Sequence, residues 1–152
     1  MDQHIPGRPI EILLVEDSDD DIQLTRETFR RDKIYNQLRI AEDGEIAMNM
    51  LRRQDKYENE PLPDLILLDL NMPNMNGYDV LKELKADPDL CRIPVVVLTS
   101  SKAETDIVKT YELKADNYVV KPVTLEKLLE IASSIEDFHF GIAKSQTKNA
   151  RH

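Results

Sequence analysis

Residues 12–21 read ILLVEDSDDD, so that four apolar residues run directly into a block in which every residue except Ser18 is acidic. Consecutive apolar residues are typical of a strand that is covered on both faces of a sheet. Carboxylates that follow such a strand lie at its carboxyl end, where open α/β sheets bind their ligands. This stretch therefore predicts both a fold class and the edge of the sheet that carries a site.

Four further apolar runs follow, each succeeded by an amphipathic or polar stretch. The five runs are 10–15 (IEILLV), 37–41 (QLRIA), 64–68 (DLILL), 94–98 (PVVVL) and 117–120 (NYVV). Apolar residues with a period of 3.6 predict helices over 125–138, around 46–51 after Gly44, around 80–84 and, more weakly, over 103–114. Thr124 is the predicted start of the last helix. Strand and helix in repeated alternation predict an α/β fold, with one parallel sheet between two layers of helices and right-handed crossovers.

The size and charge of the chain argue against several classes of function. At 152 residues it fits one domain, and its formal net charge of −9 is opposite to what a nucleic-acid-binding protein needs. No apolar run approaches bilayer length, and MDQHIPGRP at the start does not read as a signal peptide, so we expect no membrane contact and a cytoplasmic protein. Cys91 is the only cysteine, and the histidines do not cluster at ligand spacing, which argues against a zinc site.

Polar side chains follow four of the predicted strands, and in a parallel sheet these positions converge at one edge. They are Glu16 and Asp17, then Asp69, then Thr99 with Ser100 and Ser101, and finally Lys121 with Pro122. Neighbouring carboxylates repel one another by a few kcal/mol at an effective dielectric near 20, and a divalent cation removes that cost. Oxygen ligands are those that Mg²⁺ prefers. The set predicts a magnesium site that can transfer a phosphoryl group to Asp69, with Lys121 and Thr99 stabilising the group.

Four motifs, taken together, closely resemble the receiver domains of two-component response regulators. They are LLVEDS (13–18), DLILLDLNMPNMNG (64–77), IPVVVLTS (93–100) and NYVVKP (117–122). The resemblance covers about residues 9–138 and implies a single receiver domain over 1–152, with a short C-terminal extension over 139–152. It also implies a flavodoxin-like, doubly wound (βα)5 fold with strand order 2-1-3-4-5, which the periodicity alone does not predict.

The same resemblance implies a role for each residue at the sheet edge. Asp69 is similar to the phosphoacceptor of the family. Glu16 and Asp17 are similar to the acidic pair that holds Mg²⁺, with Glu16 acting through a water. Asn71 is similar to the residue whose main-chain carbonyl completes the protein ligands.

Three further positions resemble the family's switch. Thr99 matches the switch hydroxyl and Lys121 the lysine that senses the phosphoryl group, while Tyr118 matches the aromatic residue that turns inward on phosphorylation. The Lys121–Pro122 peptide bond is similar to the family's cis bond.

The function implied is a stand-alone signalling switch that takes its phosphoryl group from a sensor histidine kinase. It is not an enzyme with an outside substrate, although its own site would catalyse acceptance of the group and its later hydrolysis. The segments EDSDDDIQLTRE (16–27) and DPDLCRIPVVVLTSS (87–101) further resemble the small regulators that partner phytochrome kinases in cyanobacteria. The downstream partner is expected to be another protein.

Three other functions fit the pattern less well. A phosphatase of the haloacid-dehalogenase kind needs a second aspartate two residues after the nucleophile, where this chain has Asn71. A flavodoxin needs a first loop that holds a phosphate, which EDSDDD would repel. A pseudo-receiver would act as a binding or dimerisation scaffold without phosphorylation, but every expected site residue is present.

Some residues also have purely local interpretations. Residues 18–21 are expected to start a helix rather than to bind a ligand, and Gly77 is expected to form a turn. Ser100 or Ser101 could supply the hydroxyl in place of Thr99. Three apolar side chains near the end of the given sequence predict a homodimer contact, with a cap on the monomer's own core as the alternative, and they are Phe138, Phe140 and Ile142.

Overall fold

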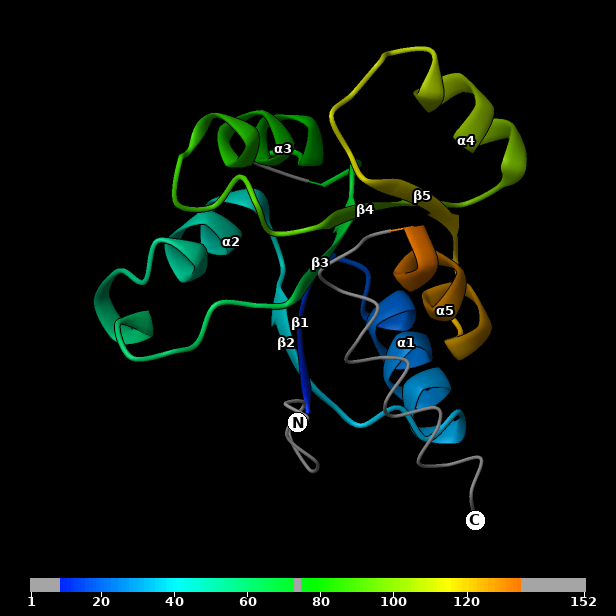
Figure 1. Ribbon diagram of the computed structural model, residues 1–152, viewed down its shortest axis with the longest axis horizontal. Coiled ribbons are helices and arrows are strands. Elements are labelled where there is room, and N and C mark those ends of the chain that lie inside the picture. The colour runs from blue at the N-terminus through cyan, green and yellow to red at the C-terminus, as the bar shows by residue number, and fades with distance from the viewer. Residues whose placement is uncertain (1–8, 73–74, 135–152) are drawn as a thin grey trace.

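In a computed structural model of the chain, which describes residues 9–72 and 75–134, five parallel strands form one sheet in the order β2-β1-β3-β4-β5 (Figure 1). The strands are β1 (Ile10–Val15), β2 (Asn36–Ala41), β3 (Leu65–Asp69), β4 (Val95–Thr99) and β5 (Asn117–Val120). The predicted strands are confirmed to within one residue at each end, and the strand order implied by the family resemblance is confirmed as well.

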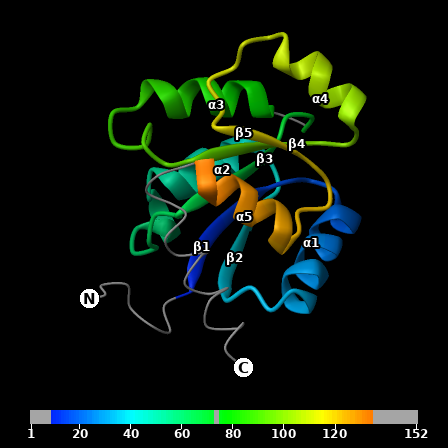
Figure 2. The same cartoon turned by 45° about the vertical axis from the view of Figure 1, so that its right-hand side comes forward.

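Five α-helices cover the two faces of this sheet. They are α1 (Asp19–Arg31), α2 (Gly44–Leu51), α3 (Gly77–Ala86), α4 (Lys102–Lys109) and α5 (Leu125–Ser134), and a short 3-10 helix, η1 (Asp55–Tyr57), follows α2. Helices α1 and α5 lie on one face, while α2, α3 and α4 pack on the other (Figures 1 and 2). None of the helices in the described part of the chain has both the length and the apolar character to cross a membrane.

The alternation of side chains along each strand explains why the runs are continuously apolar. Leu13 and Val15 of β1 point to the layer that contains α2 and α3, whereas Ile12 and Leu14 pack with α1 and α5. All four side chains have no exposed surface, because both faces of a central parallel strand are covered. The two cores therefore hold the strand ends rigidly at one edge of the sheet.

Helix α4 is shorter than the weak period over 103–114 predicted. It ends at Lys109, where the Thr110 hydroxyl donates to the Ile107 carbonyl at 2.6 Å. Glu112 then has a φ of 53°, which leaves the right-handed helical region.

The prediction that Thr124 starts the last helix is confirmed, since the Thr124 hydroxyl accepts from the Lys127 amide at 3.3 Å.

Short polar residues in the loops that follow four of the strands start the helices. The side chains of Ser18, Asp43, Asn76 and Ser101 each accept from a main-chain amide three residues later, which satisfies a donor at the beginning of the helix. The interpretation of residues 18–21 as a helix start is confirmed for Ser18. These caps also bring the first turn of each helix close to the polar edge of the sheet.

Gly77 has a different role from the predicted turn. It is the first residue of α3, and its φ lies outside the left-handed region. Its amide donates to the Leu70 carbonyl at 3.1 Å, and a Cβ here would overlap the Asp69 carbonyl oxygen and the Leu70 Cα. Glycine is therefore required because α3 begins against the main chain that carries Asp69.

We expect Gly77→Ala to lower the free energy of unfolding by about 1–3 kcal/mol, the usual cost of forcing an extra methyl into a packed site. The clashing atoms belong to the main chain and cannot rotate away, unlike the end of a flexible side chain. Urea unfolding followed by circular dichroism would measure the loss. Lys82→Ala, at an exposed position of the same helix, is the control. Equal stability of the two variants would contradict this account of Gly77.

Candidate functional site

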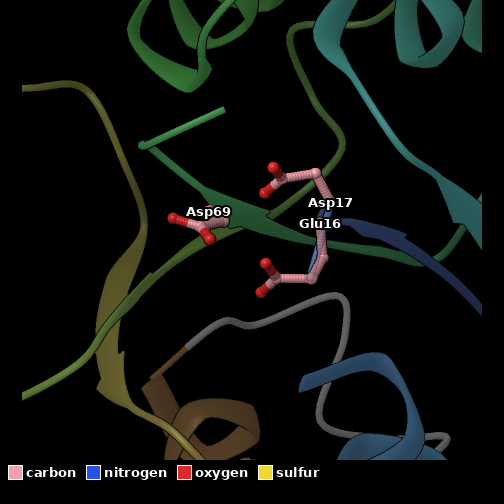
Figure 3. Close-up of side chains that lie close together, drawn as sticks. All are labelled: Glu16, Asp17 and Asp69. Carbon is pink, nitrogen blue, oxygen red and sulfur yellow. The ribbon is translucent and has the colours of Figure 1, made fainter. Parts of the chain in front are cut away.

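Three carboxyl groups meet at the carboxyl edge of the sheet. Glu16 and Asp17 directly follow β1, and Asp69 is the last residue of β3. One oxygen from each lies within 4.8 Å of the others, and Figure 3 shows the three groups gathered together. Glu16 and Asp69 are buried, while Asp17 is exposed. The sequence prediction that these residues converge is confirmed.

Lys121 brings a positive charge to the same place from the end of β5. Its ammonium Nζ lies 3.5 Å from Asp69 Oδ2 and 3.2 Å from Glu16 Oε1. A third carboxylate is closer still, because Asp21 Oδ2 lies 2.7 Å from the same nitrogen. The Lys121 amide donates to the Thr99 carbonyl at 2.8 Å, and the Lys121–Pro122 peptide bond is cis.

A second lysine holds the loop that carries Lys121. Lys127, in the first turn of α5, donates from its ammonium to the Val120 carbonyl at 2.6 Å and to the Pro122 carbonyl at 2.9 Å. These carbonyls flank Lys121 in the chain. Charged hydrogen bonds of this kind are stronger than neutral ones, so α5 fixes the main chain on both sides of Lys121.

The buried charges shift the pKa values of two groups. Burial, together with the hydrogen bond and the negative charge of Asp69, raises the pKa of Glu16 from 4.5 to about 7, against the opposing effect of Lys121. Burial alone would lower the pKa of the Lys121 ammonium, but the hydrogen bond to Asp21 and the charges of Asp69 and Glu16 raise it above its ordinary value. Lys121 therefore stays charged, and the carboxylates near it hold excess negative charge that favours a proton or a cation.

The Thr99 hydroxyl lies at the same edge but is directed toward α4. Its Oγ1 lies 2.5 Å from the Thr105 hydroxyl, and both side chains are buried. Each hydroxyl also has a carbonyl acceptor, the Ser101 carbonyl at 3.0 Å from Thr105 and the Val119 carbonyl at 3.4 Å from Thr99, so either threonine can be the donor between the two. The two serines have other roles: Ser101 caps α4, and the Ser100 amide donates to Glu104.

Asn71 follows Asp69 in the loop after β3. Its main-chain amide donates to Asp69 Oδ1 at 3.0 Å, and its side-chain amide donates to Glu104 Oε2 at 3.4 Å. An open pocket of about 370 Å³ lies beside it, and its lining consists of Asp17, Leu70, Asn71, Met72, Asn76 and Tyr78. The pocket therefore meets the carboxylate cluster at Asp17.

Tyr118 lies apart from the carboxylates. It is the second residue of β5, is half-buried, and packs with the core on the α2, α3 and α4 face. The Lys109 ammonium lies 5.8 Å from the centre of its ring. Burial raises the pKa of the Tyr118 hydroxyl. Among the described contacts, none joins this side chain to the carboxylates.

In the described part of the chain, the sequence interpretation missed four side chains that contact predicted site residues, namely those of Asp21, Glu104, Thr105 and Lys127. For Asp21, the predicted place at the helix start is confirmed, but its carboxylate also forms an ion pair with Lys121, which the sequence did not indicate. A signal for Glu104 was present, because Ser101 and Glu104 have the spacing of a helix capping box. Thr105 and Lys127 carried no such signal, since their partners lie on other elements.

Comparison with known proteins gives a family match over most of the chain. The family model described as response regulator receiver domain matches residues 12–133. Response regulator Rcp1 of Synechocystis is 48% identical over 130 residues, which are 86% of this chain and 88% of Rcp1. Chemotaxis protein CheY-3 of Vibrio cholerae is 31% identical and covers 83% of this chain and 91% of its own length.

Solved structures agree with this match. The bacteriophytochrome response regulator AtBRR superposes with a TM-score of 0.77 at 37% identity, over 84% of this chain and 93% of that one. The phosphorylated cyanobacterial phytochrome response regulator RcpA has a TM-score of 0.68 at 42% identity, over 88% of this chain and 95% of RcpA. The Mn²⁺-bound form of Rcp1 has a TM-score of 0.66 at 48% identity, over 86% of this chain and 94% of the Rcp1 chain.

Proposed function

This chain belongs to the response regulator receiver family of two-component signalling, and from that premise we propose that Asp69 accepts a phosphoryl group from a histidine kinase in the presence of Mg²⁺. The observation that carries the proposal is the position of Asp69. Its carboxylate is buried, has two further carboxylates within 4.8 Å, and lies 3.5 Å from a lysine ammonium. Covalent labelling of wild type and of Asp69→Asn by a small phosphoryl donor tests it.

The donor set fits a hard divalent cation. The three carboxylates supply only oxygen ligands, and Glu16 is held in a charge environment that favours partial protonation when no cation is bound. We propose that Asp17 and Asp69 bind the metal directly, that Glu16 acts through a water, and that the Asn71 carbonyl completes the protein ligands. The Mn²⁺-bound form of the relative Rcp1 supports a divalent site here. When bound, the cation would neutralise charge on the phosphoryl oxygens.

In the proposed reaction, an Asp69 oxygen attacks the phosphorus atom of a phosphohistidine. The new P–O bond forms as the P–N bond breaks, and the histidine leaves with the electron pair of that bond and takes up a proton. Lys121 is placed to neutralise the transferring group, since its ammonium already lies beside Asp69. Most of the catalysis is positioning, because the acceptor and the cationic side chain are held before the donor arrives.

The proposed switch starts from the contacts of Thr99. Its hydroxyl would leave Thr105 and donate to the phosphoryl group on Asp69, while Tyr118 would turn inward from its half-buried place. Both side chains lie next to α4, so the surface of that helix and of β5 would change. The signal would then pass to a partner protein by altered contacts.

We also propose that the kinase partner is a phytochrome and that the protein acts in the cytoplasm. The similarity to AtBRR and RcpA, which are both phytochrome response regulators, supports this assignment. We expect phytochrome kinases to transfer phosphoryl groups to this chain within seconds and at least about tenfold faster than unrelated kinases, because pairing specificity is a difference in transition-state binding. Radiolabelled transfer from a panel of purified kinases measures the rates. Equal rates across the panel would rule out a phytochrome preference.

The pseudo-receiver alternative gains no support from the geometry, since it does not require Asp69 and Lys121 to lie together. Homodimer formation stays a prediction. The residues on which it depends, Phe138, Phe140 and Ile142, lie outside the described part of the chain.

A further inference from the structure

The shortest contact of the Lys121 ammonium joins it to α1 and not to the predicted acceptor. Asp21 Oδ2 accepts from Lys121 Nζ at 2.7 Å, whereas Glu16 Oε1 accepts at 3.2 Å and Asp69 Oδ2 lies at 3.5 Å. Asp21 and Lys121 are 100 residues apart in the chain. An ammonium has three N–H donors, so these three carboxylates together fix its position.

Asp21 is separate from the three carboxylates that form the candidate metal site. That group consists of Glu16, Asp17 and Asp69. Asp21 reaches Lys121 from the first turn of α1, and a third of its side chain is exposed. Its contact with Lys121 can therefore persist when the three clustered carboxylates serve as ligands.

The main chain of Asp21 is held on both sides. Its amide donates to the Ser18 hydroxyl at 3.2 Å, and its carbonyl accepts from the Thr25 hydroxyl at 2.8 Å. A carboxylate in the first turn is also favoured by the partial positive charge at the start of a helix. Asp21 thus presents a short, fixed side chain to Lys121, whose own side chain has four flexible carbons.

We propose that Asp21 is a positioning residue for phosphoryl acceptance, which holds the Lys121 ammonium beside Asp69 from the first turn of α1. The inference rests on the proposed function of Asp69. A free lysine side chain samples many rotamers, and the fixed carboxylate of Asp21 keeps it in the one that points at the acceptor. Asp21 touches neither the donor nor the acceptor, and it acts only through Lys121.

The test compares Asp21→Asn with Asp20→Asn. Asp20 lies in the same first turn of α1, is exposed, and has no described contact with Lys121, so both variants lose one negative charge at the same helix end. With acetyl phosphate and Mg²⁺ as the probe, we expect the labelling rate of Asp21→Asn to fall about tenfold, the size of one charge-assisted hydrogen bond to a partly exposed group. Asp20→Asn should label at the wild-type rate. Equal rates for the two variants would overturn the proposal.

A double-mutant cycle shows whether Asp21 acts through Lys121. In a Lys121→Gln background, the further change Asp21→Asn should leave the remaining rate unchanged, because the group that Asp21 holds is gone. A second tenfold loss in that background would mean that Asp21 acts elsewhere. Asp21→Asn and Asp20→Asn should both keep the wild-type response of the melting temperature to Mg²⁺, since neither residue belongs to the metal cluster.

Nuclear magnetic resonance of the Lys121 side-chain nitrogen gives a readout that needs no phosphorylation. In Asp21→Asn its ammonium protons should exchange faster with water than in wild type, whereas Asp20→Asn should leave the exchange unchanged. If the proposed function fails, wild type itself remains unlabelled while this contact is still detected. If only the role of Asp21 fails, wild type is labelled, but the Lys121 ammonium protons exchange equally fast in wild type, Asp21→Asn and Asp20→Asn.

Discussion

Asp69→Asn is expected to abolish covalent labelling by a small phosphoryl donor, to below about 1% of the wild-type rate, because an amide has no nucleophilic carboxylate oxygen. The fold should survive this change. The asparagine side chain has the same shape as that of aspartate, and its oxygen could still accept from the Asn71 amide as Asp69 Oδ1 does. Acetyl phosphate with Mg²⁺, followed by phosphate-affinity gels and intact mass, measures the labelled fraction.

The matched control is Asp79→Asn, which removes an exposed carboxylate from the first turn of α3. It should be labelled like wild type. Wild type without Mg²⁺ should show no label, because the clustered carboxylates repel the phosphoryl group by about 4 kcal/mol per pair of charges at 4 Å and an effective dielectric of 20. A single label of unchanged yield on Asp69→Asn would place the acceptor elsewhere. Failure of wild type to be labelled at all would favour the pseudo-receiver.

The second large expected effect is that of Mg²⁺ binding on the stability of the fold. We expect Mg²⁺ to raise the free energy of unfolding by about 1.4 kcal/mol when its free concentration is ten times Kd. Asp17→Asn should weaken binding by about 100-fold, because it replaces one of three clustered carboxylates. Asp17 is exposed, so this change does not disturb the core. Differential scanning fluorimetry against Mg²⁺ concentration measures both effects.

Asp19→Asn, at an exposed position in the first turn of α1, is the control for the loss of charge. It should leave the Mg²⁺ titration close to that of wild type. An Asp17→Asn titration that overlays the wild-type curve would show that Asp17 is not a ligand.

The stability of the metal-free protein should also depend on pH. The folded-state pKa of Glu16, about 7, lies above its ordinary value of 4.5, so the stabilisation from its protonated form is present below pH 4.5 and is lost as the pH rises through 7. Bound Mg²⁺ would take the place of that proton. The gain in melting temperature on adding Mg²⁺ should therefore be larger at about pH 8 than at about pH 6.

How far the site could be predicted from the sequence depends on how local each feature is. Glu16, Asp17, Asp69 and Lys121 could be found because each directly follows a buried strand or ends one, and parallel strands end at one edge of the sheet. The strand order required the family resemblance, since periodicity gives elements but not their neighbours. The predicted length of α4 was too great, because competing side-chain hydrogen bonds, such as that of Thr110, end a helix without changing its apolar period.

Contacts between elements could not be predicted in the same way. Thr99 was correctly placed at the sheet edge, but its hydroxyl is directed to Thr105 on α4. That direction is a choice among rotamers, which depends on where the neighbouring helix packs. Lys127 reaches the Val120 and Pro122 carbonyls for the same reason, since α5 packs beside the end of β5.

The amino-acid sequence by itself determined the alternation of strands and helices, the burial of the central strands, and the set of polar side chains at one edge of the sheet. These follow from side-chain periodicity and from chain direction, which act over a few residues. Only the tertiary structure decided that Asp21 on α1 is the closest partner of Lys121, 100 residues away, and that Thr105 holds the Thr99 hydroxyl. Such contacts depend on how packed helices set the distance and rotamer of each side chain, which no local pattern of residues encodes.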